Sequence, residues 1–366
     1  MSFYEVIEKY RDFDIESYLD NVRDIDVIRS LNKSSLDEYD LLNLLSKVAT
    51  NYLEQMAQKS HDITNRYFGR AMLLYTPMYI SNYCINKCTY CGYNIESGIK
   101  RKKLDMEEIK VEGKEISKNG FKHLLLLTGE SKFHSDVEYI GEAVENLKDS
   151  FPSISIEIYP MDEDEYRYII DKGVDGLTVY QEVYDENIYK EVHLKGPKSN
   201  YKYRLDAPER GAKAGMRSLS IGSLLGLNDF RKEIFYTLMH GKYLRNKYPH
   251  VDISYSVPRI RPFKGCYENL VEVNDKDLVQ SILVMRLFDN QGGINLSTRE
   301  NVELRRNLIP LGITKLSAGV STNVGGHSQD DDTAQFKISD ESNVTEVKDM
   351  LKDIGYQPIF KDWERF

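Results

Sequence analysis

The sequence predicts an α/β fold of the (β/α)8 barrel type. The chain has 366 residues, and 41% of them are hydrophobic, which is enough to bury a sizeable core. Over residues 71–320, short apolar runs of strand-like composition alternate with amphipathic, charged stretches. Eight such alternations over about 250 residues are the number and length expected of a (β/α)8 barrel.

Residues 1–70 are expected to form a helical extension ahead of the barrel. Ser35 and Glu38 have the spacing of a capping box. They precede a set of apolar residues at helical spacing that includes Leu41 and Leu45. The pattern therefore predicts an N-terminal helical layer, with a helix start at this capping box.

The eight barrel strands are predicted from apolar runs at residues 71–80, 122–129, 153–160, 175–182, 218–226, 251–258, 293–300 and 312–319. After the first run, residues 104–120 predict a helix in which Ile109 and Ile116 share one face and Gly120 is the stop signal. Residues 321–366 are expected to pack on the barrel as a C-terminal segment with one more helix and a short extended tail.

Charge and hydropathy exclude several classes of protein. The net charge of −9 argues against a general nucleic-acid or membrane-surface binder, because such proteins need an excess of Lys and Arg on one face. No stretch approaches the roughly 20 apolar residues of a membrane span, and the N-terminus is charged throughout. We therefore expect the protein in the cytoplasm, where thiols stay reduced and a tight cysteine group holds metal more readily than disulfides.

Three of the four cysteines, Cys84, Cys88 and Cys91, lie close together after the first predicted strand, whereas Cys266 stands alone. A structural zinc site needs four N or S ligands, commonly as two C-x2-C pairs, which the C-x3-C-x2-C spacing does not supply. Thiolates normally occupy all four corners of a four-iron cubane, so three of them leave one iron open. Cysteines packed as small apolar side chains, or a partial zinc site, are the alternatives.

An open iron matches the amino and carboxylate groups of S-adenosylmethionine. Electron transfer from the cluster would then break the sulfonium bond and release a 5′-deoxyadenosyl radical, a chemistry that belongs to the cofactor while the protein positions it. A structural iron–sulfur or electron-transfer protein is an alternative of another class, and a fourth cysteine near the three would favour it. Cys266 is expected to be a packing residue, not a ligand.

Polar and charged residues follow the other predicted strands at their C-terminal ends, where (β/α)8 enzymes build their active sites. Polar residues also gather there simply because strands end, so any one of them has a structural explanation. Together they predict a site at this end of the barrel. They are Thr128, Gly129, Glu130, Tyr180, Gln181, Glu182, Gly222, Arg259, Arg299, Glu300 and Ser317.

The cysteine loop, with Tyr90 before its last cysteine, resembles the signature of radical S-adenosylmethionine enzymes. The longer segments YISNYCINKCTYCGYN, HLLLLTGE, VYQEVY, HLKGPK, SVPRIRP, LSTRE and QPIFKDW are similar to the 2-iminoacetate synthases (ThiH), the tyrosine lyases of thiamine thiazole biosynthesis. The resemblance runs from about residue 30 to the C-terminus. It implies cleavage of the Cα–Cβ bond of L-tyrosine to 2-iminoacetate (dehydroglycine) and p-cresol, with one three-cysteine [4Fe–4S] cluster and S-adenosylmethionine.

The resemblance also implies which residues hold the cofactors. In it, Glu130 meets the ammonium group of S-adenosylmethionine, and Glu182 and Arg204 hold the same amino acid moiety, since opposite charges suit a zwitterion. Gly222 would let main-chain groups lie along adenine, with Gly226 in the same turn. For Arg204 the alternative is a surface ion pair, and for the glycines a plain turn. The implied cofactor-binding set is Tyr90, Thr128, Gly129, Glu130, Glu182, Arg204 and Gly222, beside the metal ligands Cys84, Cys88 and Cys91.

For the substrate, the resemblance implies that Arg299 and Ser317 hold the carboxylate of L-tyrosine. Tyr79 would bound the amine, and Arg259 is a second candidate for the carboxylate. The resemblance also implies a thiazole synthase (ThiG-type) as partner and an electron donor such as flavodoxin or ferredoxin. The acid or base that handles the phenol is not assigned, although Glu300 could serve.

Two related families are alternatives. The hydrogenase-maturation tyrosine lyase (HydG) binds a second cluster through further C-terminal cysteines, and no cysteine follows Cys266 here, so we do not expect that cluster. Tryptophan lyase shares the barrel and the class of bond cleaved. The loop after the eighth strand departs from the tyrosine lyase pattern at Val320, Val324 and His327, so no side-chain role is carried over from it.

Overall fold

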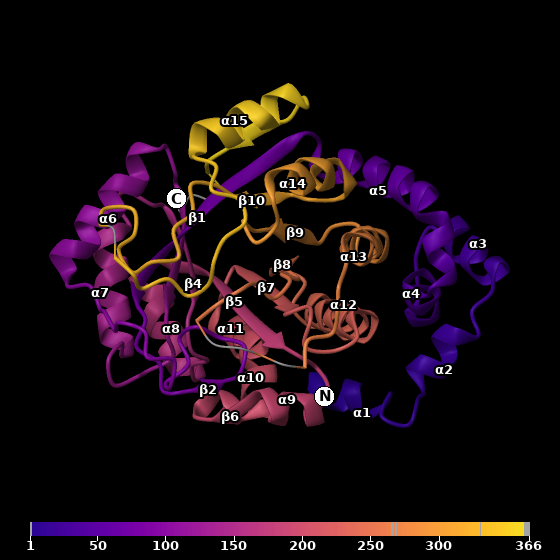
Figure 1. The fold of residues 1–366 in the computed structure, drawn as a ribbon, viewed down its shortest axis with the longest axis horizontal. Helices are drawn as coiled ribbons and strands as arrows, with labels where there is room; N and C mark the ends of the chain where they lie inside the picture. The colour runs from indigo at the N-terminus through magenta and orange to yellow at the C-terminus, as the bar shows by residue number, and fades with distance from the viewer. Residues whose placement is uncertain (1, 265–266, 268, 330, 362–366) are drawn as a thin grey trace.

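Eight parallel strands form a closed barrel in the computed structural model, which describes residues 2–264, 267, 269–329 and 331–361 (Figure 1). The strands are β1 (Ala71–Ser81), β3 (His123–Thr128), β4 (Ser153–Glu157), β5 (Val174–Glu182), β7 (Ser218–Ser223), β8 (Asp252–Tyr255), β9 (Gly293–Leu296) and β10 (Lys315–Ser317). Neighbours pair in this order, and β10 pairs with β1 to close the ring. The predicted (β/α)8 fold and all eight strands are confirmed.

Helices on the outside of the barrel connect these strands. They are α6 (Met106–Lys118), α7 (Val137–Leu147), α8 (Glu163–Lys172), α9 (Glu186–Val192), α10 (Tyr201–Leu205), α11 (Ala207–Ala214), α12 (Phe230–Lys247), α13 (Asp275–Phe288) and α14 (Val302–Leu308). In α6, Asp105 and Glu108 form a capping box, and Ile109 and Ile116 are buried as predicted. Gly120 follows the helix with a φ of 91°, which favours glycine, so the predicted stop is also confirmed.

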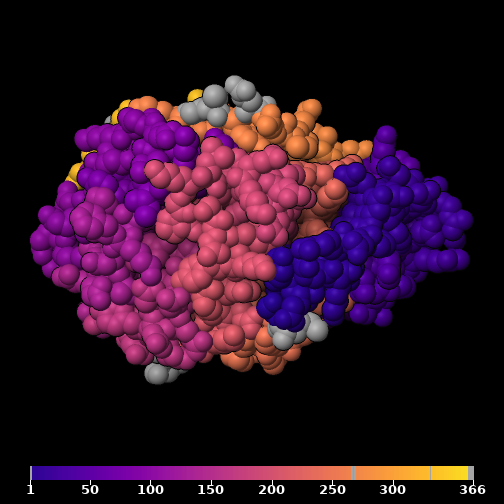
Figure 2. All heavy atoms as spheres, turned by 90° about the horizontal axis from the view of Figure 1, so that it is seen from below, coloured from indigo at the N-terminus to yellow at the C-terminus, as the bar shows by residue number. Residues whose placement is uncertain are grey.

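A layer of short helices lies along one side of the barrel (Figures 1 and 2). Its elements are α1 (Phe3–Glu8), α2 (Ile15–Asp20), α3 (Asp24–Asn32), α4 (Glu38–Leu45), the 3-10 helix η1 (Val48–Tyr52) and α5 (Leu53–Phe68). This layer packs mainly on α12 and α13. The buried amide of Gln280 in α13 donates to the carbonyl oxygens of Leu44 and Ser46, at 2.8 and 3.0 Å, which fixes the end of α4 to the barrel.

The predicted capping box in this layer is wrong. Helix α4 begins at Glu38, and its N-cap is Asp37, whose carboxylate accepts hydrogen bonds from backbone N–H groups while Asp40 completes the box. Lys33 forms ion pairs with both carboxylates, which stabilises this later start. The predicted helical layer is present, and Ser46 ends α4 in an extended conformation before η1.

The C-terminal part returns to the barrel. Helix α15 (Val344–Asp353) is followed by β11 (Gln357–Ile359), which pairs in parallel with the start of β1. A helix and a short extended tail were predicted here, and both are confirmed. At the opposite end of the barrel, β2 (Lys87–Cys88) pairs with β6 (His193–Lys195) and fixes the cysteine loop to the segment after β5, where the 3-10 helix η2 (Pro197–Ser199) follows. Within the described residues, none of the helices is both long and apolar enough to cross a bilayer.

A buried ion pair connects this C-terminal part to the rim of the barrel. Arg305 in α14 pairs with Asp340, and their side chains are only 0% and 1% exposed. The Arg305 guanidinium also donates to the carbonyl oxygen of Ser317, the last residue of β10. Arg305 therefore positions the end of β10 as well as the chain that packs over it.

Replacement of Arg305 by alanine is expected to lower the free energy of unfolding by about 3–5 kcal/mol, because Asp340 would stay buried without its partner. Urea unfolding followed by circular dichroism measures this. As a control, Arg167→Ala removes an exposed ion pair with Glu163 and should cost less than about 1 kcal/mol. Equal losses in the two variants would contradict this assignment.

Candidate functional site

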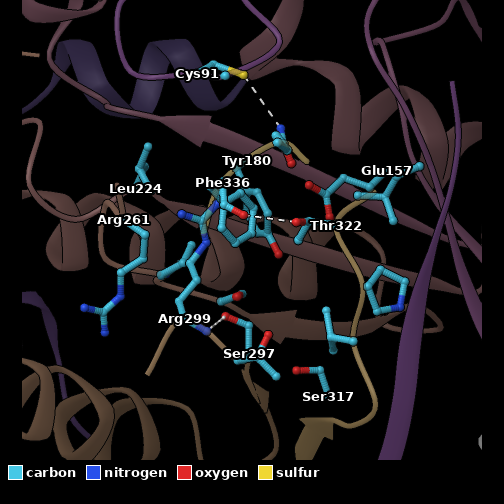
Figure 3. A pocket seen from close by; sticks show the side chains of 18 of the residues that line it. Cys91, Glu157, Tyr180, Leu224, Arg261, Ser297, Arg299, Ser317, Thr322 and Phe336 are labelled. Atoms are coloured by element: carbon cyan, nitrogen blue, oxygen red, sulfur yellow. Dashed lines mark hydrogen bonds between the residues drawn. The ribbon is translucent and has the colours of Figure 1, made fainter. Parts of the chain in front are cut away.

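Two connected cavities lie at the C-terminal end of the barrel strands. The smaller, of about 610 Å³, is lined by the three clustered cysteines, and the larger, of about 1000 Å³, extends toward β9 and β10. The larger cavity is shown in Figure 3. Residues that line both cavities are Tyr79, Cys91, Leu127, Glu157, Tyr180, Glu182, Lys198 and Gln335. A ligand in one cavity therefore lies next to a ligand in the other.

The cysteine loop follows β1 and presents three thiols to the smaller cavity. Among the described residues, no three His, Cys, Asp or Glu side chains converge as the ligands of a single metal ion would. The thiolates that bind a cubane each take a different iron, so they do not need to converge on one point. N–H groups also face the sulfurs: Gln335 Nε2 and Tyr93 N lie 3.7 and 3.4 Å from Cys91 Sγ. Such contacts are typical of cluster-binding thiolates.

The thiols need a cation to become thiolates here. Burial, together with the nearby charges of Glu130 and Cys91, raises the pKa of Cys84 to about 11. Burial also raises the pKa of Cys88 well above its ordinary value. Bound iron would supply the missing positive charge, so this donor set fits an iron–sulfur cluster.

Gly129, directly after β3, packs against the cysteine loop. Its N–H donates to Ser81 O at 2.8 Å, and a Cβ atom at this position would lie 2.4 Å from the carbonyl oxygen of Tyr83. The next residue, Glu130, accepts a hydrogen bond from the N–H of Ile85 through its carbonyl. The end of β3 and the cysteine loop therefore form one unit that leaves no room for a side chain at residue 129.

Four charged side chains form a network beside the cysteines. Arg204 Nη1 donates to Glu130 Oε1 at 2.8 Å, and Arg204 Nε donates to Tyr180 O at 2.7 Å. Lys198 Nζ donates to Glu182 Oε1 at 2.8 Å and lies 4.0 Å from Glu130. The structure thus brings the predicted residues Glu130, Glu182 and Arg204 together and excludes the exposed ion pair considered for Arg204. Lys198, within HLKGPK, was not predicted.

Glu182 has a backbone conformation that is rare for its residue type. Its φ of 71° is the one positive value found for a non-glycine residue in the described part of the chain. The pairing of β5 with β7 shifts register between Tyr180 and Glu182, and the N–H of Leu224 donates to Glu182 O at 2.8 Å. Strain of this kind is typical of functional sites, where the surrounding structure compensates for it.

Tyr90 is fixed by a buried histidine. His193 Nδ1 donates to Tyr189 O at 2.9 Å, so Nε2 is an acceptor, and the Tyr90 hydroxyl donates to it at 2.7 Å. Burial lowers the pKa of His193, and the charges of Lys198 and Arg204 lower it further, which keeps the ring neutral. The Tyr90 ring is thereby held as part of the wall of the larger cavity.

Arg299 and Ser317 both line the larger cavity (Figure 3). The Arg299 guanidinium lies 3.6 Å from the centre of the Phe336 ring, and no carboxylate among the described residues forms an ion pair with it. Burial lowers the pKa of Arg299, while Tyr79 and Glu182 oppose this effect. The Ser317 hydroxyl is buried without a well-formed hydrogen bond. The cavity therefore presents a cation and a hydroxyl that have room for an anionic ligand.

Of the other predicted site residues, some line a cavity and others do not. Tyr79 lines both cavities and donates to Gln335 Oε1 at 3.0 Å, and Thr128 lines the smaller cavity. Arg259 does not line either cavity, because its guanidinium pairs with Glu300 and Asp275.

Gly222 is not part of either wall. Packing explains the glycine at this position, because a Cβ atom there would lie 1.7 Å from Ser256 O. Gly226 has a φ of 112°, consistent with the turn predicted there.

The loop after β10 has its own structural roles. His327 donates through its N–H to Glu112 at 2.8 Å, and its Nε2 lies 3.0 Å from Pro77 O, so it connects α6 to β1. Val324 is buried, whereas Val320 lines the larger cavity. Cys266, predicted to be a packing residue, lies outside the described residues.

Several lining residues were missed. Glu157 ends β4, the one barrel strand whose end supplied no predicted residue, although the rule applied to the other strands would have found it. Gln335 and Phe336 come from the C-terminal segment, and nothing in their sequence neighbourhood marks them as part of a site.

Comparison with known proteins identifies the family. A model of the "Radical SAM superfamily" matches residues 78–238, and one of the "Biotin and Thiamin Synthesis associated domain" matches residues 256–357. The 2-iminoacetate synthases of Salmonella typhimurium and Escherichia coli are both 38% identical over 93% of this chain, which covers 90% and 91% of their lengths. The chain belongs to the 2-iminoacetate synthase family.

The structural neighbours agree with this family. The FeFe-hydrogenase maturase HydG from Carboxydothermus hydrogenoformans superposes with a TM-score of 0.87 at 28% identity, over 98% of this chain and 82% of HydG. Methylornithine synthase (PylB), at 23% identity and a TM-score of 0.75, shares the fold. Membership in the radical SAM superfamily implies a [4Fe–4S] cluster and S-adenosylmethionine, and the cysteine cavity fits them.

Gly129→Ala tests the contact between β3 and the cysteine loop. We expect it to lower the free energy of unfolding by about 1–3 kcal/mol and to reduce the iron retained after anaerobic reconstitution, because the added methyl group displaces the Tyr83 carbonyl. The matched control is Gly113→Ala in α6, where the methyl group would meet side chains and no backbone atom: the movable end of Leu147 at 2.4 Å and the Phe151 ring at 3.5 Å. Iron contents that are the same in both variants would contradict the proposed packing.

Proposed function

We propose that this chain is a radical S-adenosylmethionine lyase that cleaves the Cα–Cβ bond of L-tyrosine to 2-iminoacetate and p-cresol, for the thiazole moiety of thiamine. The observation that carries the proposal is that Arg299, which pairs with no carboxylate in the described part of the chain, lines a cavity that adjoins the cysteine loop. A carboxylate bound there would place an amino acid next to the cofactor. The family relationship supports the same reaction.

In this proposal Cys84, Cys88 and Cys91 hold one [4Fe–4S] cluster and leave one iron for S-adenosylmethionine. When bound, the cluster supplies the electron that cleaves S-adenosylmethionine and gives the 5′-deoxyadenosyl radical. The carboxylates of Glu130 and Glu182 suit the cofactor's ammonium group. Arg204, which now pairs with Glu130, suits its carboxylate. The rest of the cofactor-binding set is Tyr90, Thr128, Gly129 and, by its position, Lys198, whereas the predicted Gly222 lines neither cavity and stays a prediction.

Tyrosine would occupy the larger cavity. Arg299 and Ser317 bind its carboxylate, and Tyr79 lies beside its amine. Leu125, Leu127 and other apolar residues line the same cavity and suit the aromatic ring. The closed barrel keeps water from the radical, and the fixed walls hold the amine near it, which matters because a misplacement of about 1 Å can cost about 10²-fold in rate.

The alternative is a related aromatic amino acid lyase, either HydG-like, which the superposition with HydG favours, or tryptophan lyase-like. Product analysis separates tyrosine cleavage from tryptophan cleavage. Anaerobically reconstituted protein is mixed with S-adenosylmethionine, reductant and either amino acid. p-Cresol with 5′-deoxyadenosine supports tyrosine lysis, whereas indole derivatives from tryptophan support the other lyase. No product, together with reversible redox behaviour, would support an electron-transfer protein.

The proposed partners follow from the chemistry. 2-Iminoacetate is destroyed quickly by water, which favours direct transfer to a thiazole synthase of the ThiG type. Flavodoxin or ferredoxin would supply electrons, and the cytoplasm is the proposed compartment because thiols stay reduced there. Anaerobic co-purification with a thiazole synthase tests the transfer complex, and elution of the two proteins as separate peaks would argue against it.

Cys88→Ala is expected to abolish 5′-deoxyadenosine formation, because the cluster would lose one of its three ligands. The same assay on Cys266→Ala is the matched control, and we expect activity to be retained there. Measured by liquid chromatography, full activity in the Cys88 variant would refute the ligand assignment.

Arg299→Met should raise the KM for L-tyrosine by about 10- to 100-fold, because a hydrogen-bonded charge pair with the substrate is lost. Formation of 5′-deoxyadenosine without tyrosine should stay unchanged, which shows that cofactor binding is intact. Arg306→Met, at an exposed position on the same part of the chain, is the control. An unchanged KM in the Arg299 variant would exclude this residue as the carboxylate anchor.

A further inference from the structure

Glu157 is the last residue of β4, and it lines both the smaller and the larger cavity. Its carboxylate forms no hydrogen bond or ion pair with any described residue, unlike the carboxylates of Glu130 and Glu182, which are held by Arg204 and Lys198. A carboxylate inside a barrel is costly unless a partner neutralises it. Glu157 is therefore a charge that lacks its partner.

A second unpaired charge faces the same cavity. Arg299 has no carboxylate partner among the described residues, and Figure 3 shows its guanidinium and the Glu157 carboxylate on different parts of the cavity wall. The two groups influence each other, since Arg299 lowers the pKa of Glu157, but they do not form an ion pair. A single cavity thus holds a cation and an anion that form no ion pair with any described residue, and together they are complementary to a zwitterion, which is the form of a free amino acid.

We propose that Glu157 binds the ammonium group of the substrate and accepts its proton before the amine hydrogen is abstracted. This role rests on the proposed function. One N–H bond of the ammonium breaks and one O–H bond forms on Glu157, with no change in electron count. The products are a neutral amine and a carboxylic acid, which cost less to bury than the ion pair. A hydrogen atom can then be removed from a neutral nitrogen.

The electrostatic surroundings suit this transfer. Burial raises the pKa of Glu157 to about 7, and the charge of Glu182 contributes to the rise, whereas Arg299 lowers it. A base near pH 7 is well matched to proton transfer. The titratable and charged groups that face Glu157 come from β1, β5, the segment after β6 and the loop after β9; they are Tyr75, Tyr79, Tyr180, Glu182, Lys198, Arg204 and Arg299.

The test measures binding to anaerobically reconstituted protein with S-adenosylmethionine and without reductant, so that no turnover occurs. Calorimetry compares L-tyrosine with 3-(4-hydroxyphenyl)propionate, which has the carboxylate and the ring but no amine. Glu157→Gln should weaken tyrosine binding by about 10- to 100-fold and leave the propionate unchanged or tighter. Arg299→Met should weaken both ligands. Glu157→Asp, which keeps the charge, should retain part of the tyrosine affinity, and iron content checks that each variant is folded.

The pH dependence provides a second measurement. Tyrosine affinity of the unchanged protein should fall as the pH is lowered through about 7, because Glu157 becomes protonated and no longer attracts the ammonium. Glu157→Gln should remove this dependence.

Three outcomes would overturn the assignment while leaving the lyase function standing, provided that the unchanged protein still forms p-cresol. They are equal tyrosine affinity in the Glu157→Gln variant, equal loss for both ligands, and loss of S-adenosylmethionine binding alone. Failure of the unchanged protein to bind tyrosine would instead overturn the lyase function as well.

Discussion

The site depends on the closure of the parallel sheet through β1. This strand pairs with β10 along its first half and with β3 along its second half, so the ring is complete. Because all strands run in the same direction, their C-terminal ends meet at one rim. Closure therefore brings together side chains that lie more than 200 residues apart in the sequence, such as Cys91 after β1 and Arg299 after β9.

The charged side chains at the C-terminal end of the barrel fall into two groups, those that form ion pairs with one another and those that do not. On the side of the cysteines, two carboxylates and two cations neutralise one another, and a strained Glu182 is held among them. Toward β9, Arg299 and Glu157 form no ion pair with any residue that the structure describes. A ligand that binds Arg299 and Glu157 gains ion pairs that these two residues do not form within the protein. A ligand that binds the network beside the cysteines has to compete with ion pairs that already exist. The two cavities therefore differ in how much their residues must rearrange on binding.

The sequence predicted the architecture well because the strand runs are apolar and their spacing is regular, so all eight strands were found. The prediction failed at the Ser35 capping box, because Asp37 and Asp40 form a capping box two residues later, and Lys33 stabilises it through ion pairs with both. For the site, spacing located the cysteines, and strand ends located Glu130, Glu182 and Arg299. Arg259 was predicted from its position at a strand end in the same way, but its guanidinium pairs with Glu300 and Asp275 and does not line either cavity. Side-chain direction at a strand end is set by neighbouring charges, which a sequence pattern does not contain.

Gln335 donates toward the sulfur of Cys91, accepts from Tyr79, and its carbonyl oxygen lies where a side chain on Gly92 would be. The cavity wall beside the cysteines is thus formed by a segment that lies some 240 residues after them in the sequence. The thiols therefore gain this cover only when the last part of the chain has folded onto the barrel, so a change in the C-terminal segment reaches the cysteine loop directly.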